Sequence, residues 1–255
     1  MSRSRAPKQS LSCDEILARL RPLANAADRA GMARFGIAAD NALGIRSGVL
    51  KTLAREIGRN QKLANELWAT GIHELRHLAA YIAEPRAMTE AQAERWLRDL
   101  DSWDTCDGCC LYVFVYAPFA WKKVFEWSRR TREYEKRAAF SLIACLTVHG
   151  KTAPNEKFLK CLPLIKRAAT DERNFVRKAV NWALRQIGKR NLKLNRSAIE
   201  TCKEIQKLDS RPARWIAADA LREITSPAVQ ARLRQSESSR GIQPSRSTRP
   251  RRIRR

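Results

Sequence analysis

The sequence predicts an all-α protein in which pairs of helices stack into an α-solenoid. Three observations support this fold class. The 255 residues include only 10 Gly and 10 Pro, and most of these lie between segments with helical periodicity. No segment shows a convincing strand pattern. Similar helical segments also recur along the chain, as repeat proteins require.

Four segments each have a basic residue early, followed by Ala among larger apolar residues: LRHLAAYIA (75–83), KRAAFSLIAC (136–145), VRKAVNWALRQIG (176–188) and ARWIAADALREI (213–224). Their early arginines are separated by intervals of 61, 40 and 37 residues, and a further helix starting near Ser102 divides the first interval. Repeats of this length, each a pair of helices, are typical of HEAT-like solenoids. Such a fold has a long concave face, and we expect this face to be basic and to bind DNA.

The chain divides into three parts. Residues 1–12 and 229–255 have the composition of disordered basic tails, the second rich in Arg, Ser and Pro. Residues 13–228 form the predicted repeat domain. The apolar run LYVFVYAPF (111–119) is the one ambiguous piece, and we interpret it as a helix end followed by a turn at Pro118.

The net charge of +24 points to a polyanionic partner. Residues 1–12 carry +3 and residues 232–255 carry +8, which leaves +13 on the body. A folded body this basic indicates nucleic acid as the partner. The alternative is a general basicity that serves only solubility.

Composition also narrows the cellular context. No run of about 18 apolar residues and no secretory signal are present, so we expect a cytoplasmic protein without a membrane helix. The seven Cys are odd in number and scattered, which favours reduced thiols over a disulfide framework. Cys106, Cys109 and Cys110 share one small apolar helix face. We expect a monomer without a cofactor.

The sequence His73-Glu74-Leu75-Arg76-His77 matches the HExxH motif of zinc peptidases. The two histidines share one side of a helix, but a catalytic zinc needs a third protein ligand. Ala83 stands where a third His would follow, and Trp96 where some peptidases place a Glu. We therefore expect no metal and interpret the histidines as exposed residues of a repeat helix; a zinc peptidase remains the remote alternative.

Two helices place aromatic residues beside charges, away from their apolar faces. Ser102 is a good helix N-cap, and Trp103 and Asp107 then lie one turn apart. This pair is a candidate site, although a partly buried Trp beside a solvated Asp is an equal alternative. In the helix at 174–190, Trp182 shares a stripe with three cations, Lys178, Arg185 and Lys189.

A Trp within a basic stripe is suited to contacts with phosphates and bases, so we assign DNA binding to this helix. The assigned residues are Lys178, Arg185, Lys189 and, near the start of the helix, Arg177. The alternative is a Trp182 that packs against the next repeat.

Several segments, taken in order, resemble the AlkD-type DNA glycosylases of the DNA alkylation repair family. They are RFGIAADNALGIRSGVLKTLAREIG, NELWATGIHELRHLAAYIA, SWDTCD, FEWSRRTREYEKRAA and NFVRKAVNWALRQIG, and the resemblance covers most of residues 13–228. The family's key residues match Trp103, Asp107, Arg137 and Trp182. This sequence departs from the pattern at Lys136, where an Arg is common, and in the Cys-rich CDGCC.

The resemblance implies a HEAT-like solenoid that hydrolyses the N-glycosidic bond of N3- or N7-alkylated purines in duplex DNA without base flipping. It implies catalytic roles for Asp107, Trp103, Trp182 and Arg137, the last gripping a phosphate. The chemistry is reasonable, because a cationic base leaves without a general acid, and a carboxylate can stabilise the sugar cation and position water. The alternative is a HEAT-like DNA-binding protein that has lost catalysis.

Overall fold

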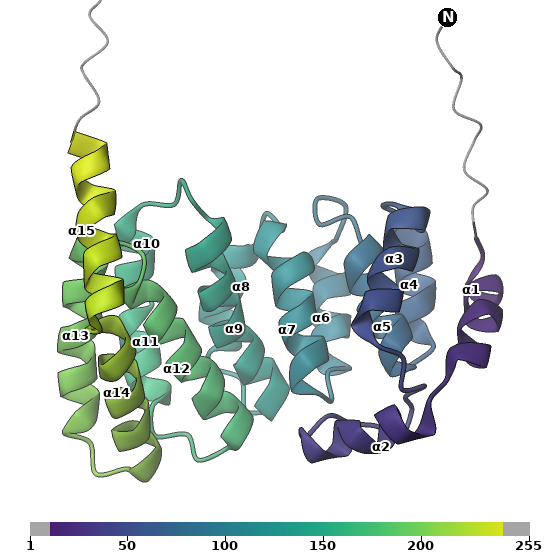
Figure 1. Ribbon diagram of the computed structural model, residues 1–255, viewed down its shortest axis with the longest axis horizontal. Helices are drawn as coiled ribbons and strands as arrows, with labels where there is room; N and C mark the ends of the chain where they lie inside the picture. The colour runs from purple at the N-terminus through teal and green to yellow at the C-terminus, as the bar shows by residue number, and fades with distance from the viewer. Residues whose placement is uncertain (1–10, 242–255) are drawn as a thin grey trace, which may run out of the picture.

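In the computed structural model, residues 11–241 are described, and every regular element in this range is a helix (Figure 1). The predicted all-α fold class is confirmed. The helices form two layers that run side by side along the long axis of the molecule. One layer consists of α3 (Ser47–Ile57), α5 (His73–Ile82), α7 (Trp103–Tyr112), α9 (Glu133–His149), α12 (Asn174–Gly188) and α14 (Arg211–Ile224), each packed on the next.

The second layer covers the first. It consists of α4 (Gln61–Ala69), α6 (Glu90–Arg98), α8 (Ala120–Trp127), α10 (Asn155–Leu159), α11 (Leu162–Ala168) and α13 (Leu192–Gln206). The four repeated segments of the sequence fall in α5, α9, α12 and α14, all in the first layer. Each contributes fully buried alanines, such as Ala79, Ala138, Ala183 and Ala217. Small side chains at these positions let neighbouring helices pack closely.

The N-terminal elements flank this array. They are α1 (Cys13–Leu20), the 3-10 turn η1 (Arg21–Leu23) and α2 (Ala26–Arg34). Helix α2 lies along the lower edge of the array in Figure 1, and the segment that follows it reaches α7. This placement sets α2 beside the predicted Trp103–Asp107 site.

The C-terminal boundary differs from the prediction. Helix α15 runs from Pro227 to Gly241 and packs on α13 and α14, so the predicted disorder does not begin at residue 229. Leu233 is 2 % exposed, and the Arg232 guanidinium donates to the Lys189 carbonyl at 3.0 Å. The Gln230 side chain also donates to Asn195 Oδ1 at 3.1 Å and to the Ile224 carbonyl at 2.7 Å. These contacts anchor a segment whose composition is otherwise that of a solvated tail. Residues 1–10 and 242–255, predicted as tails, lie outside the described residues.

The ambiguous apolar run is resolved as predicted. Helix α7 ends at Tyr112, the 3-10 turn η2 (Phe114–Tyr116) follows, and α8 begins after Pro118. The cysteines are free thiols, and Cys106, Cys109 and Cys110 are fully buried on one face of α7. Burial raises the pKa of the Cys109 thiol well above its ordinary value, which keeps it protonated and unreactive.

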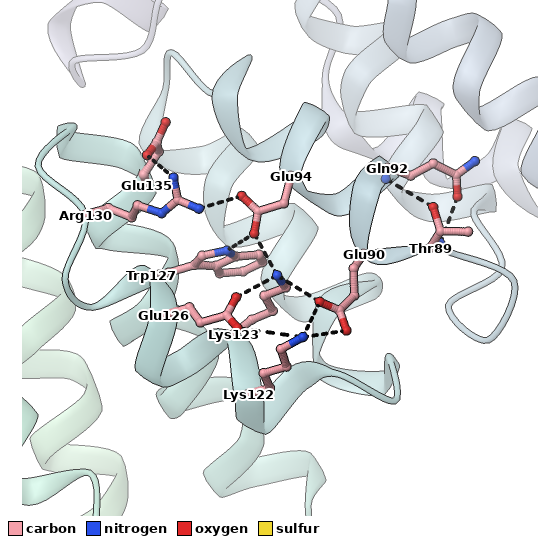
Figure 2. Close-up of polar contacts among 10 residues, drawn as sticks. All are labelled: Thr89, Glu90, Gln92, Glu94, Lys122, Lys123, Glu126, Trp127, Arg130 and Glu135. Atoms are coloured by element: carbon pink, nitrogen blue, oxygen red, sulfur yellow. Dashed lines mark hydrogen bonds and ion pairs between the residues drawn. The ribbon is translucent and has the colours of Figure 1, made fainter.

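An ion-pair network joins α6 to α8 (Figure 2). The Lys123 side chain is only 5 % exposed, and its ammonium lies 2.7 Å from Glu126, 2.8 Å from Glu94 and 3.1 Å from Glu90. Burial alone would lower the pKa of Lys123, but the three carboxylates raise it well above its ordinary range. The Glu94 carboxylate also accepts from the Trp127 indole at 2.9 Å. This network ties α6 to α8 within the second layer.

None of the helices within residues 11–241 has the length and apolar character needed to cross a bilayer.

Candidate functional site

Helices α7 and α9 bring three of the four predicted catalytic residues together. Trp103 is the first residue of α7, and Asp107 follows one turn later on the side facing α9. Arg137 lies one turn into α9. Ser102 occupies the predicted N-cap position, but its hydroxyl donates to the Asp104 carboxylate at 2.6 Å rather than capping the backbone.

The Asp107 carboxylate is rigidly held. Arg137 forms a bidentate pair with it, Nε to Oδ1 at 3.1 Å and Nη2 to Oδ2 at 2.7 Å. The Ser141 hydroxyl, one turn further along α9, donates to Oδ1 at 2.7 Å. A carboxylate has about four acceptor positions, so three donors leave one on Oδ2. With its side chain 22 % exposed, Asp107 can present that position to a reactant.

Arg137 is a positioning group in this structure. Its side chain is 6 % exposed, and its Nη1 donates to the Phe175 carbonyl of α12 at 2.6 Å. Burial alone would lower the pKa of the guanidinium, but Asp107 raises it above its ordinary value. Because three of its donors already have protein acceptors, the phosphate grip expected for Arg137 does not fit this geometry.

Trp103 is half-buried, and contacts hold both its indole N–H and its ring face. Its indole N–H donates to the Phe35 carbonyl at 2.9 Å, and the Arg137 guanidinium carbon lies 5.9 Å from its ring centre. The next residue after Phe35, Gly36, has φ +69°, and a Cβ there would lie 2.5 Å from the Phe175 ring. This backbone conformation and the close approach favour glycine where the segment after α2 passes Trp103 of α7 and Phe175 of α12. The Phe35 side chain is 71 % exposed beside Trp103.

The stripe on α12 is only partly available to a ligand. Lys189 pairs with Glu223 of α14 at 2.5 Å, and Arg185 pairs with the same carboxylate at 2.8 Å. Lys178 is exposed and has no ion pair within the described residues. Trp182 is half-buried and packs against the hydrophobic core. Within residues 11–241 no hydrogen bond or ring contact joins Trp182 to Asp107.

One exposed aromatic residue near Arg177, Trp215, was not predicted from the sequence. Trp215 of α14 is 40 % exposed, and the Arg177 guanidinium carbon lies 5.3 Å from its ring centre. The spacing of the apolar residues could have identified it. Ala213, Ile216 and Ala217 form the buried face of α14, and Trp215 lies off this face. Arg177 and Trp215 together extend the aromatic and basic surface from α12 to α14.

The histidines are not exposed, so that interpretation is wrong. His73 is 7 % exposed, and the Nε2 atoms of His73 and His77 lie 3.0 and 3.1 Å from Asp104 Oδ2. A helical wheel of α5 places them away from its own core, but the first turn of α7 covers them. Burial alone would raise the pKa of Asp104, but the two imidazoles lower it well below its ordinary range.

Glu74 has a structural role. It is 1 % exposed, and its carboxylate accepts from the backbone N–H groups of Leu43, Gly44 and Ile45 at 2.8, 2.7 and 3.1 Å. A zinc peptidase needs this carboxylate as a base beside the metal-bound water. Here it anchors the loop between α2 and α3, and this geometry does not support peptidase chemistry.

Comparison with known proteins identifies the family. The family model described as "DNA alkylation repair enzyme" matches residues 16–224. A solved structure described as "A new family of proteins related to the HEAT-like repeat DNA glycosylases with affinity for branched DNA structures" is similar over 91 % of this chain and 95 % of that chain, at 21 % identity and a TM-score of 0.68. At this identity the likeness concerns the fold.

A designed armadillo repeat protein in complex with a (KR)4 peptide aligns over 76 % of this chain and 82 % of its own at 13 % identity, with a TM-score of 0.34. No curated protein matches.

Proposed function

The chain belongs to the DNA alkylation repair enzyme family, and on this premise we propose that it is a DNA glycosylase that removes N3- or N7-alkylated purines from duplex DNA. One observation carries the proposal. The Asp107 carboxylate is fixed by Arg137 and Ser141, lies one turn from a half-buried Trp103, and keeps an acceptor position open. An Arg137–Asp107 ion pair that served only stability would not require the Trp103 ring beside it.

The proposed reaction is hydrolysis of the N-glycosidic bond. The bond between the sugar carbon and the alkylated purine breaks, and its electron pair neutralises the cationic base. Positive charge then develops on the sugar, where the Asp107 carboxylate and the Trp103 ring stabilise it. Water adds to the sugar carbon, and Asp107 accepts its proton. The products are the free base and an abasic site.

Arg137 and Ser141 serve this reaction by orienting Asp107. Preorganised charge stabilises a transition state without reorganisation at the moment of reaction, and a bidentate guanidinium is a rigid support for a carboxylate. Trp103 and Asp107 are only half-buried, so we infer that they act on the sugar of a stacked nucleotide rather than on a flipped base. Trp182, half-buried on α12, lies beyond α9 in the same layer, and its part in the reaction would be to contact the DNA further along this surface.

The duplex would lie over α12 and α14. Within the described residues Lys178 is exposed and forms no ion pair with an acidic side chain. The Arg177 guanidinium lies over the ring of the exposed Trp215. Cations suit phosphates, and an exposed indole suits a sugar or base. We propose this surface, with the Phe35 side chain at its other end, as the DNA-binding face.

The direct test uses duplex DNA that contains N7-methylguanine or N3-methyladenine. The full chain in excess over DNA should release free base at a rate that saturates with protein concentration. Release of free base no faster than in buffer without protein would refute the proposed glycosylase activity.

A non-catalytic DNA-binding protein is the second candidate. It is favoured by the fold similarity to a protein related to the glycosylases and described as having affinity for branched DNA. The same assay separates the two, provided that binding to an alkylated duplex and to a branched junction is measured in parallel.

Charge reversal within the stripe should have unequal effects. We expect Lys178→Glu to weaken binding of alkylated duplex more than Arg185→Glu, because Arg185 already pairs with Glu223 and contributes less free charge. Fluorescence anisotropy at several salt concentrations measures both affinities. Unchanged affinity in both variants would place the DNA elsewhere on the molecule, and equal losses would show that the pair with Glu223 does not keep Arg185 from the DNA.

Removing residues 242–255 should change binding but not chemistry. This segment carries six Arg and no acid, and the cut leaves α15 intact. We expect weaker binding to undamaged duplex and a flatter salt dependence, by about 0.9 in the log–log slope for each phosphate that the segment neutralises. The rate of base release at saturating protein should be unchanged. A truncated chain that binds but does not excise would place part of the active site in residues 242–255.

A further inference from the structure

Three ligand-type side chains converge at the start of α5 and α7. The Nε2 atoms of His73 and His77 face the same carboxylate oxygen, Asp104 Oδ2, and the three atoms all lie within 4.8 Å of one another. The cluster lines a pocket of about 210 Å³ that extends beneath α2, between Met32, Ile45 and the histidines. Neither the glycosylase chemistry nor the DNA-binding face uses it.

The orientation of the carboxylate is set independently of the histidines. The other oxygen, Asp104 Oδ1, accepts from the Ser102 hydroxyl at 2.6 Å and from the Thr105 N–H at 2.9 Å. Supporting hydrogen bonds of this kind aim carboxylate ligands at metal ions. The contacts therefore leave Oδ2 directed at the two imidazoles and the pocket.

The charges around this corner leave Asp104 to the histidines. Its side chain is 19 % exposed, and within residues 11–241 it pairs with His73 and His77 and with no Lys or Arg. The nearest guanidinium in the pocket lining, Arg46, pairs with Asp28 instead. A divalent ion between the two imidazoles and Asp104 would supply this carboxylate with a counter-charge.

We propose that His73, His77 and Asp104 form a binding site for a divalent transition-metal ion such as Zn²⁺. Two nitrogens and one oxygen suit zinc, and three protein ligands leave a position open toward the pocket. Tetrahedral ligand atoms at about 2.1 Å from one ion lie about 3.4 Å apart, so ligand atoms that lie within 4.8 Å of one another must close by no more than about 1.4 Å. The Nε2–Oδ2 separations of 3.0 and 3.1 Å are already close to the tetrahedral value.

The ion would act as a brace in this site. It would tie α5 to α7, while the adjacent Glu74 ties α5 to the loop before α3. Because Glu74 is committed to backbone N–H groups, the site lacks a base beside the open position and differs from a peptidase site in spite of the shared motif. Asp107 lies on the α9 side of α7, so the ion would not contact the proposed catalytic carboxylate.

Zinc uptake by the untagged full chain tests the proposal. Protein stripped with EDTA is dialysed against micromolar Zn²⁺, and the bound metal is counted by elemental analysis. We expect one ion per chain and a rise in unfolding temperature on metal addition. His77→Gln and Asp104→Asn should each lower zinc affinity by at least the ~100-fold that changes to supporting residues reach. His149→Gln is the matched control, because this histidine pairs with Tyr116 outside the cluster, and it should bind zinc normally.

The outcomes are distinct. A stripped wild-type chain that folds but takes up no zinc refutes the site, and so does a His77→Gln variant with wild-type affinity. If Asp104→Asn fails to fold, His77→Gln still decides, because that side chain is 14 % exposed at the pocket edge. Zinc lost from His149→Gln as well would assign the metal to another place on the surface.

Discussion

Asp107→Asn should lower the single-turnover rate of base release by about 10²–10³-fold, the usual loss when one electrostatic catalytic group is removed. The amide keeps the size of the side chain but cannot stabilise a sugar cation or accept a proton from water. DNA affinity should stay close to that of the wild type, because Asp107 donates nothing to phosphates. The measurement is base release under excess protein, with the bound fraction determined in parallel.

The same substitution should also destabilise the fold. It leaves the Arg137 guanidinium, 6 % exposed, with the Phe175 carbonyl but without its counter-ion. Breaking a buried pair in this way costs about 3 kcal/mol. The rates must therefore be compared at a temperature where circular dichroism shows both proteins to be folded.

Ser141→Ala is the matched control for Asp107. It removes one hydrogen bond to the carboxylate and keeps the charge and the pair with Arg137. We expect a much smaller loss of rate than in Asp107→Asn. An Asn variant that excises at the wild-type rate while folded and bound would remove Asp107 from the mechanism.

Lys123→Ala should have the largest effect on stability outside the site. It removes the cation that three carboxylates share between α6 and α8, and its side chain is 5 % exposed (Figure 2). Because Glu90 and Glu126 keep some contact with water, we place the loss at about 3 kcal/mol, the lower end for a broken buried pair. Urea unfolding followed by circular dichroism measures it.

Lys122→Ala is the neighbouring control. Its side chain is 58 % exposed, and it pairs with the same Glu90 carboxylate from the solvent side. Exposed pairs contribute little, so this variant should unfold close to the wild type. Equal losses in the two variants would show that burial of Lys123 does not decide the energetics of the network.

Local sequence patterns were sufficient to predict the fold. The alternation of Ala with larger apolar residues identifies α5, α9, α12 and α14, because each of these helices shows its neighbours a face of small side chains. The end of α7 and the turn at Pro118 follow from the same periodicity. The pattern does not predict α15, because this helix is anchored by Leu233 and by hydrogen bonds from Gln230 and Arg232 rather than by a periodic apolar face.

The candidate site required more than one helix to be known. Spacing alone placed Asp107 one turn after Trp103, but the donors that hold it, Arg137 and Ser141, come from another helix. For the same reason the histidines were misjudged. Their helix has its apolar face elsewhere, and only the packing of α7 on α5 shows that Asp104 covers them. Contacts between repeats are not visible in the periodicity of either repeat.

Release of N7-methylguanine by the full chain in excess over a methylated duplex tests the central claim most directly. Binding of the same duplex and of a four-way junction should be measured on the same preparation, with Asp107→Asn beside the wild type. We expect wild-type release that saturates with protein concentration and falls by about 10²-fold or more in the variant. Tight binding to either DNA without release above the rate in buffer would contradict it and would make the chain a DNA-binding protein without glycosylase activity.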